Sequence, residues 1–193
     1  PHARKHWHDG KQLLLPPLAG VPVRELPVQE PVEVKATSSS LGSDRVQATF
    51  DAKGRLLTLV VDGVATPFTG PANELWLYPD QPHRFEAWEI DRHTLSCGKA
   101  DVRLAEATVF SRGPGRAGVA FARPVGQRSQ VIVRYSLEAG QPVLGIEYDL
   151  DWQEETTLLK AVFPTAFTGT DARFGGAFGS IRRAQMGGTM AAE

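Results

Sequence analysis

The chain has little of what disulfide-bonded, membrane-spanning or strongly basic proteins need. Cys97 is the only cysteine among 193 residues, so it can form no internal disulfide and no thiolate metal site, which fits a reducing compartment. No apolar run approaches the roughly 20 residues of a spanning helix. The formal net charge of -1 gives no electrostatic case for nucleic acid or an anionic membrane. We therefore expect a cytoplasmic protein with no nucleic-acid and no membrane partner.

Few segments space their apolar residues with the 3.6-residue period of a helix. Most space them with a period of two residues instead. Apolar side chains recur at alternate positions or in short runs, as they do in half-buried strands. These segments are 32–38, 44–50, 55–61, 101–110, 116–123, 129–137 and 143–152. Many of the 19 glycines and 14 prolines lie between them, where tight turns need such residues. The pattern predicts an all-β sandwich with little helix.

The two ends of the chain differ from its middle. Residues 13–31 carry five prolines, which cannot donate to a central strand ladder. We expect residues 1–34 to form an edge hairpin and a linker. Residues 35–193 would then form the sandwich, and the Gly- and Ala-rich sequence at its end suggests that the sandwich is truncated there.

Several of these segments together resemble a known family. Residues 38–60, 70–91, 113–121, 151–164 and 178–183 occur in the order and spacing of the β-rich region of family 38 glycoside hydrolases, the retaining α-mannosidases. In that family this region lies downstream of the catalytic domain. The resemblance implies a large twisted antiparallel β-sandwich like that of galactose mutarotase, a supersandwich, with residues 1–34 as the tail of a smaller β domain.

The resemblance also implies that the chemistry lies elsewhere. In the family, an aspartate nucleophile and a divalent metal, expected to be zinc, sit on an α/β domain that would precede residue 1. The chain would then contain no catalytic residue, metal site or cofactor of its own. Its partners would be its own catalytic domain and a mannose-containing oligosaccharide, while homo-oligomer formation stays open. Arg183 matches a family arginine, but Met186 and Gly188 replace the histidine and asparagine that usually follow it.

The stretch 78–91 holds the residue types that sugar chemistry uses. On a strand, Glu89 and Asp91 would lie on one face about 6.6 to 7 Å apart, within the spacing of roughly 6.5 to 9.5 Å that inverting glycosidases need. Any two acids at i and i+2 on a strand give this spacing, and such neighbours point in parallel rather than across a sugar. We therefore favour a polar face over a catalytic pair.

Other clusters also have simpler interpretations. A calcium site built from Asp149, Asp151, Glu154 and Glu155 would lack the glycine and the distal glutamate of a calcium loop. Strand alternation instead predicts a core face with Tyr148, Leu150 and Trp152, which makes Trp152 a structural anchor. His2, His6 and His8 have only Asp9 nearby, so we expect a frayed terminus and not a metal site.

Lys160 interrupts the apolar run 158–163. It could be buried against a carboxylate, with Asp151 and Glu154 as candidates. It could instead extend its charged end to solvent. The sequence leaves both interpretations open.

The prolines Pro79 and Pro82 predict that the chain leaves the sheet where polar residues cluster. We hypothesise that Asp80, His83 and Arg84 form interdomain hydrogen bonds or one side of a mannoside cleft, to which Arg183 would also contribute. Trp88 would anchor this loop on the core.

The alternative is an independent carbohydrate-binding module with a stacking platform. Its rings would be Trp76, Tyr78, Phe85 and Trp88. Leu75 and Leu77 on the opposite strand face argue against it, because a free platform does not need two apolar faces. A stand-alone mutarotase ranks third, since nothing in the sequence orients His83 or His93 toward an acid.

Overall fold

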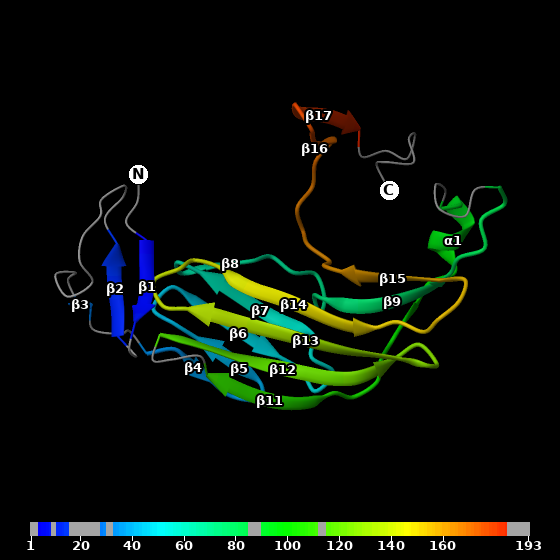
Figure 1. Ribbon diagram of the computed structural model, residues 1–193. Coiled ribbons are helices and arrows are strands. Elements are labelled where there is room, and N and C mark those ends of the chain that lie inside the picture. The colour runs from blue at the N-terminus through cyan, green and yellow to red at the C-terminus, as the bar shows by residue number, and fades with distance from the viewer. Residues whose placement is uncertain are drawn as a thin grey trace. The chain divides into compact units, whose positions relative to one another are not determined.

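The computed structural model describes residues 4–8, 11–15, 28–29, 33–84, 90–111 and 115–184 (Figure 1). The chain divides into two compact units. The first comprises Pro1–Thr66 and Val102–Gln153, and the second comprises Pro67–Asp101 and Glu154–Glu193. Strands dominate both units, which confirms the predicted all-β class. No helix in the described ranges is long and apolar enough to cross a membrane.

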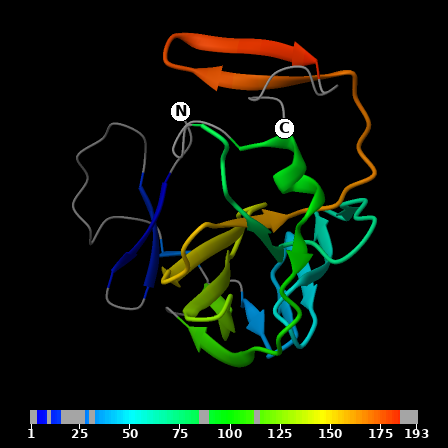
Figure 2. The same ribbon diagram turned by 90° about the vertical axis from the view of Figure 1, so that its right-hand side faces the viewer.

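The first unit is built on two antiparallel sheets. One has the order β11 (Glu106–Ser111), β12 (Arg116–Val125), β13 (Ser129–Glu138) and β14 (Leu144–Asp151). The other has the order β4 (Lys35–Ala36), β5 (Ser40–Gly42), β6 (Val46–Phe50), β7 (Leu56–Val61) and β8 (Val64–Ala65). Figure 2 shows them as two layers, yellow to green and blue to cyan. The predicted sandwich is thereby confirmed.

The core of this sandwich follows from the alternation of two. Along β13, Val131, Val133, Tyr135 and Leu137 are at most 5% exposed, while the residues between them are half-buried. The rings of Phe50 on β6 and Tyr135 on β13 lie 4.4 Å apart between centroids. Aromatic contacts of this kind join the inner faces of the two sheets.

The predicted core face of β14 is wrong for two residues. Tyr148 and Leu150 are 44% and 41% exposed. They lie opposite the buried Val133 and Val131, on the side of the sheet that carries the core. However, β14 is the edge strand of its sheet. Side chains on an edge strand have a neighbouring strand on one side only, so less of their surface is covered. Trp152 follows the strand and is half-buried, so its role as an anchor stays a prediction.

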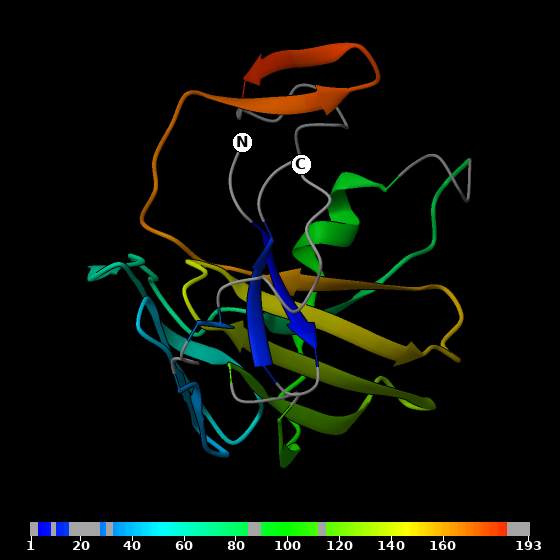
Figure 3. The same cartoon turned by 60° about the vertical axis from the view of Figure 1, so that its left-hand side comes forward.

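The described N-terminal strands form a small sheet. The strands β1 (Arg4–His8) and β2 (Lys11–Leu15) pair antiparallel, and β3 (Val28–Gln29) pairs with β2 (Figure 3). This agrees with the predicted hairpin near the start of the chain. The boundary at residue 34 stays a prediction. The predicted frayed terminus is wrong for His6 and His8, which lie on β1 opposite Leu13 and Lys11, whereas His2 and Asp9 fall outside the described ranges.

The second unit contains a three-stranded sheet and a separate hairpin. The central strand β9 (Glu74–Pro79) lies between β10 (Lys99–Ala100) and β15 (Thr157–Val162). The hairpin pairs β16 (Asp171–Gly176) with β17 (Gly179–Ala184). A short helix α1 (Arg92–Ser96) precedes β10. Its five residues are too few to produce the helical periodicity that sequence reasoning looks for.

Candidate functional site

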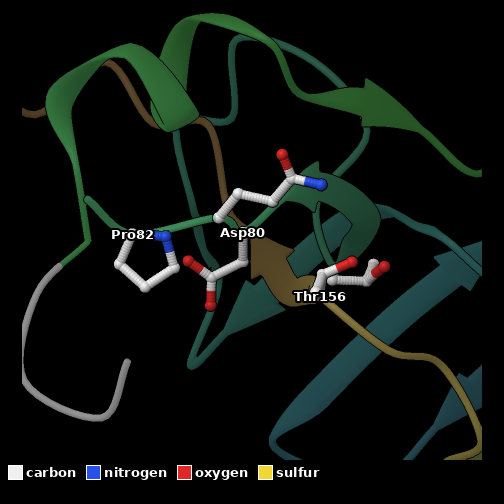
Figure 4. Close-up of a pocket in the computed structure, with 5 residues that line it drawn as sticks. Asp80, Pro82 and Thr156 are labelled. Carbon is white, nitrogen blue, oxygen red and sulfur yellow. The ribbon is translucent and has the colours of Figure 1, made fainter. Parts of the chain in front are cut away.

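A cavity lies where β9 ends and β15 begins. The strand β9 ends at Pro79, as the sequence predicts, because proline has no N–H to continue the ladder. The next residue, Asp80, donates its backbone N–H to the Thr156 carbonyl at 2.8 Å, which joins the loop to the start of β15. Asp80, Gln81, Pro82, Thr156 and Thr157 line the cavity, which has a volume of about 490 Å³ (Figure 4).

The carboxylate of Asp80 is the charged group of this lining. Figure 4 shows it beside the Pro82 ring, with Thr156 on its other side. Its Oδ1 is buried and has no hydrogen-bond partner among the described residues. A buried carboxylate oxygen without a donor is unfavourable, and in native structures such a group commonly marks a position that a ligand, ion or water fills.

The backbone of Thr156 is strained at the edge of the same cavity. Its φ is 45°, in the left-handed region that β-branched residues rarely adopt. Strain of this kind costs about 1 to 3 kcal/mol and tends to concentrate at functional sites. The hydroxyl of the next residue, Thr157, donates to the Glu155 carbonyl at 2.8 Å and keeps its acceptor capacity.

Of the other predicted loop residues, His83 and Arg84 are exposed. The backbone N–H of His83 donates to Asp91 Oδ2 at 3.0 Å. This hydrogen bond joins His83, near the start of the loop, to Asp91 at its end. Residues 85–89 lie outside the described ranges, so the anchoring role of Trp88 and the pairing of Glu89 with Asp91 stay predictions.

Arg183 lies on β17 and not in the loop. Its guanidinium carbon is 5.5 Å from the centroid of the Phe174 ring across the hairpin, and the residue is half-buried. The neighbouring Arg182 is exposed, and its Nη1 lies 3.7 Å from Asp171 Oδ2. A role for Arg183 at a sugar-binding edge stays a prediction, and Met186 and Gly188 fall outside the described residues.

The proposed stacking platform is partly closed. Trp76 and Tyr78 lie on one face of β9, as expected, with ring centroids 6.2 Å apart, and Trp76 Nε1 donates to Glu74 Oε2 at 2.8 Å. Tyr78 is only 8% exposed. The Lys160 ammonium lies 5.7 Å from the centroid of the Tyr78 ring. Lys160 is half-buried, so the interpretation of a lysine that extends along an apolar surface describes it better than a buried ion pair.

Sequence reasoning identified Asp80 but missed Gln81, Thr156 and Thr157. These threonines reach the site through the antiparallel register, in which Thr157 lies opposite Pro79. No local sequence pattern predicts that β15 pairs with β9, because the two strands are far apart in the sequence. In the part of the chain that the structure describes, no three His, Cys, Asp or Glu side chains group closely enough to hold a metal ion.

Comparisons with known proteins agree with the resemblance seen in the sequence. The family model described as "Glycosyl hydrolases family 38 C-terminal domain" matches residues 41–191. "Alpha-mannosidase 2C1" of Homo sapiens is 26% identical over an alignment of 166 residues, and the match covers 82% of this chain. The chain spans only 16% of the length of that relative. Because the family model matches well over half of the chain, this protein belongs to the glycosyl hydrolases of family 38, of which it forms a C-terminal domain.

Proposed function

We propose that this chain is the non-catalytic β-sandwich part of a metal-dependent retaining α-mannosidase. The observation that carries the proposal is the family match over residues 41–191, together with a relative named as an α-mannosidase. The reaction belongs to a catalytic domain of the parent polypeptide. There, an aspartate nucleophile and a divalent metal, zinc by our expectation, would act on the mannoside. We place this enzyme in the cytoplasm, which agrees with a single cysteine in 193 residues.

The role of this chain is to pack on that catalytic domain and, through its second unit, to complete one wall of the mannoside cleft. Two features of the loop after β9 support this role. It presents Asp80, His83 and Arg84 next to a sheet that holds its start in place, and binding residues concentrate on loops that a rigid scaffold positions. Its cavity also lies in the volume range of small-molecule sites. Arg183 would contribute a further cation to the same wall.

Kinetics of the parent enzyme test this role. Asp80→Ala in the parent should lower kcat/KM for an aryl α-mannoside by tenfold or more, about 1.4 kcal/mol, because an interaction with substrate or with the catalytic domain is lost. Asp171→Ala is the matched control, since Asp171 is an exposed aspartate of the same unit outside the cavity. Equal kinetics for both variants would contradict a cleft role for Asp80. A parent enzyme that fails to hydrolyse α-mannosides, or that keeps full activity after removal of metal by a chelator, would contradict the proposed enzyme class.

The carbohydrate-binding module is the weaker candidate. A stacking platform requires open ring faces, whereas the buried Tyr78 packs beside Trp76 and under Lys160. No observation among the described residues favours the module over the mannosidase domain.

A further inference from the structure

The cavity beside Asp80 has the composition of a sugar subsite. It combines a carboxylate, the carboxamide of Gln81 and two threonine hydroxyls with the apolar ring of Pro82. A pyranose presents the complementary surface, since its hydroxyls both donate and accept while its C–H face is apolar. A metal cation would need several oxygen ligands of higher charge, and the lining supplies a single carboxylate.

One oxygen of the Asp80 carboxylate lacks a donor in the part of the chain that the structure describes. Oδ1 is buried without a partner, and the backbone N–H of Asp80, which could have taken part in a local turn, is already committed to Thr156 at 2.8 Å. Because Oδ1 is buried, a donor that enters the cavity reaches it only after the carboxylate turns about the Cβ–Cγ bond toward the opening. Two adjacent hydroxyls on a ring match the two oxygens of a carboxylate.

We propose that this cavity binds one pyranose unit of a mannose-containing oligosaccharide, and that a vicinal diol of the sugar donates to the carboxylate of Asp80. Gln81 and Thr156 bind neighbouring hydroxyls, and the Pro82 ring packs on the C–H face. The strained φ of 45° at Thr156 is part of the arrangement, because the same residue accepts the bond that holds Asp80. The identity of the sugar rests on the proposed function, whereas the cavity itself is formed by residues of this chain.

The test is a titration of the 193-residue chain with methyl α-D-mannopyranoside, followed by amide chemical shifts. The amides of Asp80, Gln81, Thr156 and Thr157 should shift with a millimolar dissociation constant. Asp80→Asn, which keeps the shape and removes the charge, should weaken binding tenfold or more. Asp171→Asn, the matched control, should bind as the unsubstituted chain does. If Asp80→Asn does not fold, Gln81→Ala, which alters an exposed side chain of the same lining, should weaken binding several-fold.

The titration is repeated with the corresponding methyl glucoside and methyl galactoside, and with calcium chloride. The inference is overturned if none of the three sugars shifts these amides, whether or not calcium chloride does. It is also overturned if Asp80→Asn binds with the same affinity as the unsubstituted chain. Failure here is distinct from failure of the proposed function. A parent enzyme that hydrolyses α-mannosides while the chain binds no pyranoside would overturn only the subsite. A chain that binds pyranosides within a parent that hydrolyses no α-mannoside would overturn only the enzyme class.

Discussion

The phenol of Tyr135 reaches across the core of the first unit to the backbone of a turn. It is fully buried, and its hydroxyl donates to the Gly54 carbonyl at 2.8 Å. Gly54 has a φ of 76°, and a Cβ there would lie 2.7 Å from the Phe121 side chain, so both backbone conformation and space require glycine. This hydrogen bond therefore ties the turn between β6 and β7 to the opposite sheet.

Tyr135→Phe should lower the free energy of unfolding by about 1 to 3 kcal/mol, because the substitution leaves the buried Gly54 carbonyl without its donor. Urea denaturation, followed by circular dichroism, measures this as a lower midpoint. Tyr148→Phe is the control, since Tyr148 is 44% exposed and surface substitutions usually change stability by less than about 0.5 kcal/mol. Equal midpoints for the two variants would contradict the role of the phenol.

Asp51 holds the same turn from its other side. Its Oδ1 accepts the backbone N–H groups of Lys53 and Arg55, both at 2.9 Å, and its Oδ2 accepts Arg55 Nε at 2.8 Å. Partial burial raises the pKa of the Asp51 carboxyl, but the hydrogen bonds from Arg55 and Lys53 outweigh this effect. The net pKa therefore lies below the usual 3.8.

A folded-state pKa below the unfolded value means that the carboxylate stabilises the fold above the unfolded pKa. That contribution is lost as the pH falls through the lower, folded pKa. Asp51→Asn should therefore lower the melting temperature at pH 7, by an amount that reflects about 1.5 to 3 kcal/mol for hydrogen bonds to a charged group. The difference from the unsubstituted chain should shrink below about pH 3.8. Asp149→Asn, which removes an exposed ion pair with Arg134, should change the melting temperature little at either pH. A difference for Asp51→Asn that is constant with pH would contradict the assignment.

At the scale of elements, the chain that enters β10 passes close to Tyr78 of β9 at Gly98. A Cβ at Gly98 would lie 2.1 Å from the Tyr78 ring, which no unshifted structure permits. The absence of a side chain at Gly98 lets the chain pass close to the Tyr78 ring of β9, the strand that ends at Pro79, one residue before Asp80.

Gly98→Ala should destabilise the second unit by about 1 to 3 kcal/mol, because the ring of Tyr78 must move to accommodate the added methyl group. Thermal unfolding followed by tryptophan fluorescence measures the effect, since Trp76 stacks beside Tyr78. Gly175→Ala is the matched control, because a Cβ at this strand glycine would meet nothing within 4 Å. If Gly98→Ala is no less stable than Gly175→Ala, the close packing is not required.

At the scale of the whole molecule, the 193-residue chain alone should hydrolyse no aryl α-mannoside, because catalysis is proposed to need a domain outside it. The measurement is release of the chromogenic aglycone in the presence of zinc, against a Glu89→Ala, Asp91→Ala double variant. Turnover by the unsubstituted chain above that of the double variant would contradict the prediction and restore the carboxylate pair as a catalytic candidate.

The sequence by itself determined the architecture of the first unit and the family. Alternation at Val131, Val133 and Tyr135 needs only the period of a strand, and Pro79 ends β9 because it lacks an N–H, so both are local properties. The resemblance carried by residues 38–60 and 151–164 is likewise a property of the sequence, which the family match confirms.

The tertiary structure alone decided which residues meet. Tyr148 and Leu150 carry the alternation of core residues but are exposed, because a sequence period does not reveal that β14 is an edge strand. Thr156 and Thr157 join Asp80 in one cavity because β15 pairs with β9 in a particular register. Pairing between distant strands depends on how whole sheets pack, and for this reason the partners of Asp80 could not be predicted from the sequence around it.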